Sequence, residues 1–439
     1  MQSGNMKALV RFMMCAFRVL RRFSLTNGGG ADFQFAGAEI SNPPSLESSG
    51  TPGGFEALRN GILRYSRLKI CATPEGRSER CARRPFIVGV LLFAGFVASA
   101  PAMVTSLYIF GDGVSTTTNN TNPSVASLYY GHRFCNGRVW VEVLAQRQGV
   151  AYIPTNNWSY FGHYSSELVT NVNRFTAPPD ASTALFIVWV SDADFVYDLN
   201  QVDPPYTTNG SLAAWTSLIN QSLTNHLRAI QTLYAKGART LLMPNAVDVS
   251  KAPYYAYLTN TDRSFVRQRV MDFNTGLVTK LNQARATLPG LTIYMPDLFA
   301  LLDDISAHPA NYGMVNPGID AINDPSLADK SLNGPGTNYL FWDYLDPTAM
   351  GHARVADVAQ QLMSPVNFSK LTPVNGASQL DVANVPVGRN GFVEASTNFL
   401  DWTAIQGMNS TNVSQRLLVP VSGAEQYYRL RFPSAWSWP

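Results

Sequence analysis

Residues 107–119 read LYIFGDGVSTTTN, and the order of apolar and turn-forming residues in this stretch decides the fold. A short apolar run gives way to Gly111, Asp112 and Gly113, which are residue types typical of a tight turn. In open α/β sheets, ligands bind beyond the carboxyl ends of the strands. We therefore predict a strand over Ser106 to Asp112 and a functional turn at its end.

From residue 105 onward, short apolar runs alternate with long amphipathic segments. This alternation is typical of a parallel sheet covered by helices, so the fold class is predicted to be α/β, with a three-layer α/β/α arrangement. The further strands are expected at Ala184 to Ser191, Arg239 to Asn245 and Leu291 to Pro296, with a short one ending near Trp342. Helices are expected at Arg138 to Gln148, Ala213 to Lys236, Ser264 to Thr287 and Thr348 to Met363.

Several polar segments follow the predicted strands directly. Because the carboxyl ends of parallel strands meet at one edge of the sheet, these segments are expected to converge on one cleft. They are Asp112-Gly113, Ser191 to Asp194, Asn245 and Asp343 to Asp346.

The character of the chain changes after Met363. Residues 364–376 read as a helix-free linker, and runs of alternating polarity such as QYYRLRF follow it. We predict a small all-β module over residues 366–439, which resembles C-terminal β modules appended to exported bacterial proteins. A structural appendage without a ligand and a sugar- or surface-binding module both remain open.

The N-terminal hundred residues have the organisation of an export signal. Arg83 and Arg84 precede the apolar run PFIVGVLLFAGFV, and Ala98-Ser99-Ala100 follows it as a cleavage site. The apolar run is shorter than the ~20 residues of a membrane-spanning helix. We predict a signal peptide over residues 85–102, a secreted or cell-envelope location, and no membrane span after cleavage. Residues 1–84 are then translated non-coding sequence or a disordered extension.

The charge of the chain depends on this division. The whole sequence carries 33 Lys and Arg against 30 Asp and Glu, but residues 1–102 hold 13 and 6 of them. The remainder has 33 − 13 = 20 basic and 30 − 6 = 24 acidic residues. This balance gives no support to nucleic-acid binding. The same remainder keeps Cys135 as its single cysteine, so an intrachain disulfide is not expected.

Four blocks of sequence resemble the SGNH/GDSL hydrolase family of lipases and esterases. The turn at FGDG is similar to the family's FGDS, and FWDYLDPTAMGH (341–352) is similar to its WDxxHPT. Between them, RFCNGRVWVEVLA (133–145) and VWVSDADF (188–195) resemble two further blocks in the same order. The resemblance implies an SGNH domain with a flavodoxin-like parallel sheet over residues 103–365.

The same resemblance implies the positions of the catalytic groups, and three of them are substituted. Gly113 stands at the position of the nucleophilic serine, and Asp346 stands at that of the histidine. Of the two oxyanion-hole groups beside the nucleophile, the glycine corresponds to Gly137 and the asparagine to Ala193. Asp343 keeps the position of the triad acid.

Two residues near these blocks are candidates for a relocated function, and both have a structural alternative. Ser115 lies two residues beyond the nucleophile position, outside the strained turn that would aim an attacking oxygen. His132 lies close to Gly137 and is the candidate for a displaced base. His352 is expected inside the last helix of the domain as a packing or surface residue.

The acidic residues of the blocks allow a second interpretation. Asp112, Asp194, Asp343 and Asp346 are all placed at strand ends. If they crowd one cleft, they would raise one another's pKa values, hold a hard cation or activate water. The alternative is that they hold loops by hydrogen bonds, with Asp194 capping the segment that follows it. No metal and no cofactor are assigned.

Three functions are compatible with these observations. The first is an exported protein of the ester-hydrolase family that binds an ester- or glycan-type ligand without turning it over. The second is an active carboxylic-ester hydrolase with relocated catalytic residues. The third is a cell-surface adhesion or structural protein. The oligomeric state stays open.

Overall fold

A four-stranded parallel sheet forms the centre of the main domain. The computed structural model describes residues 33–34, 63–71, 104–120, 127–202, 204–206, 208–421 and 425–433. In it the strands lie side by side in the order β3-β4-β5-β6. Every residue of β4 is buried, as expected for a strand covered on both faces. The strands are β3 (Leu107–Gly111), β4 (Leu185–Trp189), β5 (Thr240–Leu242) and β6 (Thr292–Tyr294).

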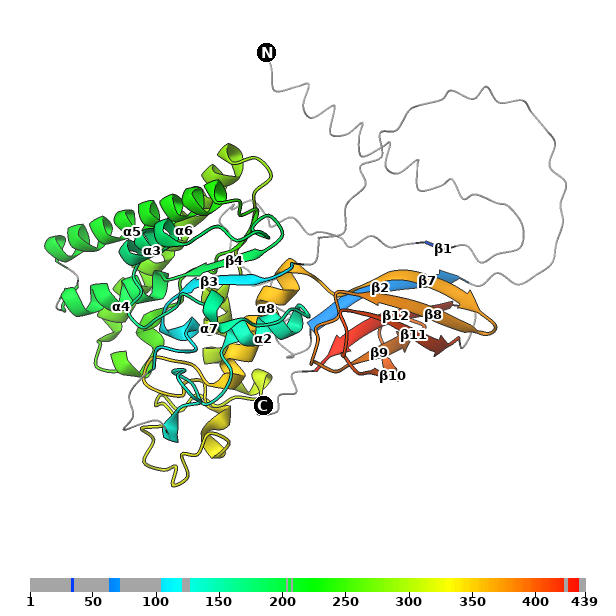
Figure 1. The fold of residues 1–439 in the computed structure, drawn as a ribbon. Coiled ribbons are helices and arrows are strands. Elements are labelled where there is room, and N and C mark those ends of the chain that lie inside the picture. The colour runs from blue at the N-terminus through cyan, green and yellow to red at the C-terminus, as the bar shows by residue number, and fades with distance from the viewer. Residues whose placement is uncertain are drawn as a thin grey trace, which may run out of the picture.

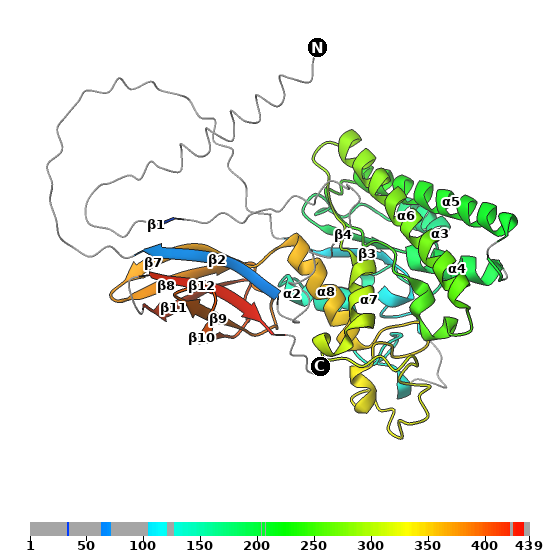
Figure 2. The ribbon, with the colours of Figure 1, turned by 180° about the vertical axis from the view of Figure 1, so that it is seen from behind.

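Helices cover both faces of this sheet (Figure 1 and Figure 2). Helices α3, α5 and α6 lie over one face, and α2, α7 and α8 lie over the other, so the predicted three-layer α/β/α fold is confirmed. The helices are α2 (Trp140–Arg147), α3 (Ser165–Arg174), α4 (Ser191–Gln201), α5 (Asn209–Ala235), α6 (Asn260–Thr287), α7 (Leu298–Ala307) and α8 (Ala349–Met363). Short 3-10 turns are η1 (Gly113–Ser115), η3 (Pro154–Asn156), η4 (Val249–Lys251), η5 (Pro253–Tyr255), η6 (Pro309–Tyr312) and η7 (Pro335–Asn338).

The sequence prediction of the main domain was incomplete in two ways. Helices α3, α4 and α7 were not predicted, because each spans only 10 or 11 residues and a segment of about three turns gives a weak helical period. The fifth strand expected near Trp342 is wrong: among the described residues, Phe341 forms only an isolated antiparallel bridge with Pro347. Two prolines, Pro335 and Pro347, bracket this region and limit regular pairing.

A separate all-β module follows α8, as predicted. One of its sheets has the order β11-β8-β7 and the other β1-β2-β12-β9-β10, and all pairs are antiparallel. The two sheets share one apolar core that includes Leu380, Val393 and Leu430. The strands are β7 (Asn367–Val374), β8 (Ala377–Ala383), β9 (Gly391–Ser396), β10 (Thr403–Met408), β11 (Ser414–Pro420) and β12 (Glu425–Phe432).

The segment expected to be a linker, residues 364–376, contains the whole of strand β7 instead. Pro373 obscures the strand pattern in the sequence, but β7 is an edge strand, where the missing N–H of a proline is tolerated. Two more strands, β1 (Phe33–Gln34) and β2 (Leu63–Cys71), lie within the predicted leader. Leu63 pairs with Phe432 and Cys71 pairs with Glu425, which places β2 beside β12 (Figure 1). The division of the chain into leader, signal and domains stays a prediction.

The β module contacts the α/β domain through a buried cluster of charges. Asp357 of α8 forms ion pairs with Arg147 of α2 at 3.1 Å and with Arg389 of the module at 2.7 Å. Arg147 Nη1 also donates to the carbonyl oxygen of Val387 at 3.0 Å. The three arginines near Asp357, the third being Arg354, lower the pKa of its carboxyl group. The module is therefore docked on α2 and α8.

The predicted signal peptide, residues 85–102, lies outside the described residues. Within the described ranges, no helix combines the length and the apolar character needed to cross a membrane. Cys135 is buried and makes no disulfide.

Candidate functional site

The turn after β3 is organised by Asp112 and Gly111. The Asp112 carboxylate caps η1 by accepting a hydrogen bond from the Val114 N–H at 3.1 Å. A Cβ on Gly111 would lie 2.6 Å from the Ser115 side chain and 2.9 Å from Ser159 Oγ. Ser159 Oγ accepts a hydrogen bond from the Gly111 N–H at 2.9 Å. Glycine is therefore required at 111, because a side chain there would collide with Ser115, the last residue of η1, and with Ser159.

Gly113, at the predicted nucleophile position, lies under an aromatic ring. A Cβ built on Gly113 would lie 3.2 Å from Cδ2 of Phe161 and 3.8 Å from Cδ2 of Phe134. Ser115, the nearest alternative nucleophile, is completely buried. Its hydroxyl accepts a hydrogen bond from Trp140 Nε1 at 3.0 Å. The turn thus presents no hydroxyl group at the position from which the family's serine would attack.

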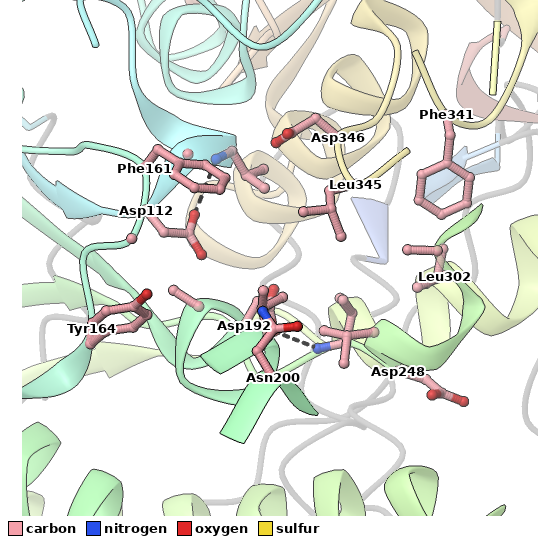
Figure 3. A pocket seen from close by; sticks show the side chains of 18 residues that line it. Asp112, Phe161, Tyr164, Asp192, Asn200, Asp248, Leu302, Phe341, Leu345 and Asp346 are labelled. Carbon is pink, nitrogen blue, oxygen red and sulfur yellow. Dashed lines mark hydrogen bonds between the residues drawn. The ribbon is translucent and has the colours of Figure 1, made fainter. Parts of the chain in front are cut away.

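A cavity of about 160 Å³ opens beside this turn and is here called the main cavity (Figure 3). It brings together four of the positions selected from the sequence, namely Asp112, Gly113, Ala193 and Asp346. Its remaining lining residues are mostly apolar, and none of the eighteen is Ser, Thr, Cys, His, Lys or Arg. The others are Val114, Phe161, Gly162, Tyr164, Asp192, Val196, Asn200, Val247, Asp248, Val249, Ala252, Leu302, Phe341 and Leu345.

In the loop before α8, Asp346 lines the main cavity and Asp343 does not. The Asp343 carboxylate accepts hydrogen bonds from the N–H groups of Leu345 and Asp346, at 2.9 and 2.8 Å, and from the Tyr129 hydroxyl at 2.8 Å. Asp343 therefore holds the shape of this loop. The Asp346 side chain is 4% exposed, and it makes no hydrogen bond among the described residues. Burial, together with the charges of Asp343 and Asp112, raises the pKa of Asp346.

Asp192 is a cavity residue that the sequence analysis did not select. It is buried at the start of α4, and its carboxylate accepts a hydrogen bond from the Val247 N–H at 3.0 Å. Burial raises its pKa, with the Asp112 charge as the next cause. Burial likewise raises the pKa of Asp112 to about 7. The run SDAD, which starts at Ser191 directly after a strand, was the signal available for Asp192.

Asp194 was expected at the cleft but points away from it. Its carboxylate accepts hydrogen bonds from the Ser165 N–H at 2.8 Å and from the Ser222 hydroxyl. It therefore holds the start of α3 rather than the segment that follows it. The reason is helical geometry, because residues two apart lie about 200° apart around a helix axis. Asp192 and Asp194 consequently face different sides of α4.

Asp194, Ser222 and His226 form a Ser-His-Asp group outside the main cavity, but its hydrogen bonds are not those of a catalytic triad. In a triad the acid accepts from the histidine and the histidine accepts from the serine. Here the serine hydroxyl donates to Asp194, while His226 Nδ1 lies 2.8 Å from the Ser222 carbonyl oxygen. Ser222 and His226 are both buried. The group connects α4 to α5 and has no access to the main cavity.

The remaining candidates do not line the main cavity. His132 is exposed, and its Nδ1 lies 2.9 Å from the carbonyl oxygen of Asn120. Gly137 is buried in the segment that leads into α2. His352 lies inside α8, where its Nδ1 accepts a hydrogen bond from the Trp140 N–H at 3.2 Å. Burial lowers the pKa of His352 to about 3, so this histidine is neutral and structural.

A second cavity of about 90 Å³, here called the inner cavity, adjoins the main one. The two share the lining residues Val114, Asp192, Val247, Leu302, Phe341 and Leu345. Except for Asp192, the inner cavity is lined by apolar side chains, glycine and proline, including Trp189, Leu298, Leu301, Ile305 and Val355. The described part of the chain holds no group of three or more His, Cys, Asp or Glu residues placed to bind a metal ion.

Two known proteins are similar to this chain in sequence. The thermolabile hemolysin of Vibrio parahaemolyticus is 21% identical over 286 residues, which cover 61% of this chain and 65% of the hemolysin. The chain thus spans less than two thirds of the hemolysin's length. A GDSL esterase/lipase of Arabidopsis thaliana is 22% identical over 340 residues, covering 62% of this chain and 87% of the plant protein.

Among solved structures, a catalytic mutant of an acetylxylan esterase from Geobacillus stearothermophilus matches with a TM-score of 0.34 and 11% identity. That match covers 59% of this chain and 94% of the esterase. The model of the GDSL-like lipase/acylhydrolase family matches residues 107–359, which is more than half of the sequence. The chain therefore belongs to the GDSL-like lipase/acylhydrolase family.

Proposed function

We propose that this chain is a catalytically degenerate member of its family, which binds an ester- or glycan-type ligand in the main cavity without hydrolysing it. One observation carries the proposal. The described residues that line the cavity include no serine, threonine, cysteine or histidine, although the cavity lies at the turn where the family places its nucleophile. A hydrolase of this type needs an attacking oxygen and an imidazole in contact with the same ligand.

The size of the expected loss supports this proposal. Loss of a triad nucleophile or base alone costs on the order of 10⁶ in turnover, and the effects of triad members do not add. A missing oxyanion-hole donor costs roughly a further 10² to 10³. In this chain the position of the nucleophile is Gly113, that of one oxyanion donor is Ala193, and that of the base is Asp346. The candidates for relocation give no replacement, because Ser115 is buried against Trp140 and His132 lies away from the cavity.

Ligand binding is supported by the shape and chemistry of the retained cleft. Binding pockets are typically concave, mainly apolar and equipped with a few polar groups. The main cavity meets this description, with aromatic rings from Phe161, Tyr164 and Phe341 and carboxyl groups from Asp112 and Asp346. Tyrosine and phenylalanine faces pack against sugar rings and acyl chains.

An active hydrolase of unusual chemistry is the second candidate, because one specific observation favours it. Burial raises the pKa of Asp112 to about 7, and a general base is most effective when its pKa is near the working pH. In this alternative, Asp112 or Asp346 would activate a water molecule directly. The alternative still needs oxyanion stabilisation, and Ala193 carries no side-chain donor.

We also propose that the protein is exported, on the basis of the signal-like segment at residues 85–102. N-terminal sequencing of protein recovered from the culture medium tests this. A mature N-terminus near Ala100 or Ala102 supports export by cleavage. A start far upstream of Ala98 contradicts it.

Hydrolysis of short p-nitrophenyl esters by the purified protein is the decisive test of the non-catalytic function. We expect no turnover above the buffer rate, and no change in Ser115→Ala, His132→Ala or Asp346→Ala. Turnover that disappears in Ser115→Ala or His132→Ala would establish relocated catalytic residues. Turnover that disappears in Asp346→Ala or Asp112→Asn would establish carboxyl chemistry instead.

A further inference from the structure

Three buried carboxyl groups reach the main cavity from three separate elements. Asp112 comes from the turn after β3, Asp192 from the start of α4, and Asp346 from the loop before α8. Figure 3 shows Asp112 and Asp346 on one side of the cavity and Asp192 on another. All three side chains are at least nine-tenths buried. Such burial makes an unneutralised carboxylate costly.

The protein provides few partners for these groups. Asp112 accepts a hydrogen bond from Val114 N–H, and the N–H of Ala193 also stabilises its charged form. Asp192 accepts one from Val247 N–H. Asp346 accepts none among the described residues. The N–H of Asp112 itself also stabilises its carboxylate. An ionised carboxylate has about four acceptor sites, so these partners leave acceptor sites open on all three groups, and all three residues line the cavity.

Among the described residues, no lysine, arginine or histidine is paired with Asp112, Asp192 or Asp346. The lining of the main cavity contains no lysine, arginine or histidine. Asp248, the fourth acidic lining residue, differs because it is paired with Arg267 at 3.1 Å and accepts the Ser250 hydroxyl at 2.6 Å. The countercharge for Asp112, Asp192 and Asp346 must therefore come from protons or from a bound cation.

An organic cation fits this site better than a metal ion. The described residues contain no group of acidic, histidine or cysteine side chains placed for metal coordination. The walls are instead apolar and aromatic, with Phe161, Tyr164 and Phe341 in the lining. Aromatic faces attract ammonium groups by cation–π interaction, and apolar walls favour the carbon atoms attached to the nitrogen.

The inner cavity provides space for an apolar tail. The inner cavity shares several lining residues with the main cavity, among them Asp192, which is its one acidic lining residue. Leu298, Leu301 and Ile305 of α7 line it. A ligand with a charged head in the main cavity would place an alkyl chain in this apolar space.

We propose that the ligand of this cleft carries a small alkylammonium group, whose nitrogen lies among Asp112, Asp192 and Asp346 and whose apolar substituent enters the inner cavity. The proposal rests on the ligand-binding function proposed above and specifies the chemical class of that ligand. An ester or a sugar that carries a protonated amine meets this requirement. Asp346 is expected to contribute most to the selectivity for charge, because its carboxylate accepts no hydrogen bond from the residues that the structure describes.

The proposal predicts that the affinity depends on pH. The titratable groups around Asp346 are Asp343 and Tyr344 on its own loop, Tyr129, Cys135 and Asp112. Asp194 lies near Asp112, and Asp192, Tyr164 and the paired Asp248 also line the cavity. Burial holds the pKa of Asp112 at about 7, so Asp112 is protonated below that pH. A cation binds the deprotonated form. Its affinity should therefore rise as the pH increases, by up to about tenfold per pH unit for one released proton.

Calorimetric titration of the full chain with three probes of equal length tests the proposal. The probes are n-pentylammonium, 1-pentanol and pentanoate, at about pH 5.5 and about pH 8, where the amine stays protonated. We expect pentylammonium to bind at least about tenfold more tightly than pentanol at the higher pH, and the difference to shrink at the lower pH. Asp346→Asn should remove most of the difference. Asp401→Asn, which removes an acid from the surface of the β module, should leave it unchanged.

The outcomes separate this proposal from the proposed function. Equal binding of pentylammonium and pentanol, or tighter binding of pentanoate, would overturn the ammonium proposal and leave the ligand-binding function standing. Hydrolysis of a p-nitrophenyl ester by the same preparation would overturn the non-catalytic function without affecting the comparison of charges. The pH dependence of the unmodified protein tests the proposal independently of whether Asp346→Asn folds.

Discussion

The ring of Phe161 lies over Gly113, with 3.2 Å between Phe161 Cδ2 and the point where a Cβ of residue 113 would be. Phe161 is 54% exposed, so its ring covers Gly113 from the surface and is not part of the core. Loss of the serine and the position of this ring act together, because the ring occupies space that an attacking hydroxyl would need. Restoration of catalysis therefore involves Phe161 as well as the three substituted positions.

We expect the triple variant Gly113→Ser, Ala193→Asn, Asp346→His to gain measurable p-nitrophenyl acetate hydrolysis. Addition of Phe161→Ala should increase the rate further, to roughly 10²-fold above the unmodified protein, because the hydroxyl becomes accessible. The control is the same set without Gly113→Ser. A control as active as the full set would contradict the assignment of position 113.

The two glycines that flank Asp112 should respond differently to alanine. Gly111→Ala places a methyl group 2.6 Å from the buried Ser115 side chain, so overpacking should lower the free energy of unfolding by about 2 to 3 kcal/mol. Gly113→Ala places a methyl group 3.2 Å from the exposed ring of Phe161 and no closer than 3.8 Å to its other neighbours, and should cost less than about 1 kcal/mol. Urea denaturation of both variants measures the difference. Equal losses would contradict this account of the turn.

Asp112→Asn should change how stability depends on pH. The folded-state pKa of Asp112 is raised to about 7, so its favourable contribution is complete below the unfolded-state pKa and is lost as the pH rises toward 7. The asparagine variant should therefore gain stability relative to the unmodified protein over that window. The total change is on the order of 4 kcal/mol, from about three pKa units. The measurement is the free energy of unfolding of the unmodified protein and of Asp112→Asn at several pH values between about 4 and 8. Parallel curves for the two proteins would show that Asp112 titrates normally.

Removal of Asp357 should destabilise the contact between the β module and the α/β domain. Its carboxylate lies between Arg147 and Arg389 with nearly complete burial, and Asp357→Asn would leave the arginines without a countercharge. We expect a loss of about 3 to 5 kcal/mol in unfolding free energy. Asp381→Asn removes an ion pair of the module whose arginine partner, Arg416, is exposed, and should change the stability far less because solvent screens this pair. Similar losses in both variants would show that the buried cluster does not hold the interface.

The sequence predicted the parallel sheet well because its strands are short apolar runs that end at turn residues. Strand β4, over Leu185–Trp189, is buried throughout and has no polar residue to obscure it. Helix α3 was missed because its buried residues are only Ser165, Leu168 and Val172. Two buried apolar residues are too few to show a helical period in the sequence. Strand β7 was missed because a proline, here Pro373, is typical of a linker in the sequence. The strand tolerates this proline because it lies at the edge of its sheet.

The candidate site was predictable only to the level of strand ends. The sequence placed Asp112, Gly113, Ala193 and Asp346 at one edge of the sheet, and the structure brings these four together in one cavity. It did not distinguish the inward-facing Asp192 from Asp194, because that depends on where α4 begins its first turn. Nor does a local pattern indicate that Phe161 covers Gly113, since this contact joins segments that are distant in the sequence.

Asp343 illustrates why a recognisable motif is a poor guide to activity. Its carboxylate accepts hydrogen bonds from two backbone N–H groups of its own loop and from the Tyr129 hydroxyl, so this residue has a structural role that does not depend on hydrolysis. An aspartate at this position is thus informative about the architecture of a chain and neutral about its chemistry. An esterase assignment that rests on this aspartate alone therefore identifies the fold of the loop, and the residue three positions later, here Asp346, is the one that bears on the proposed loss of the base.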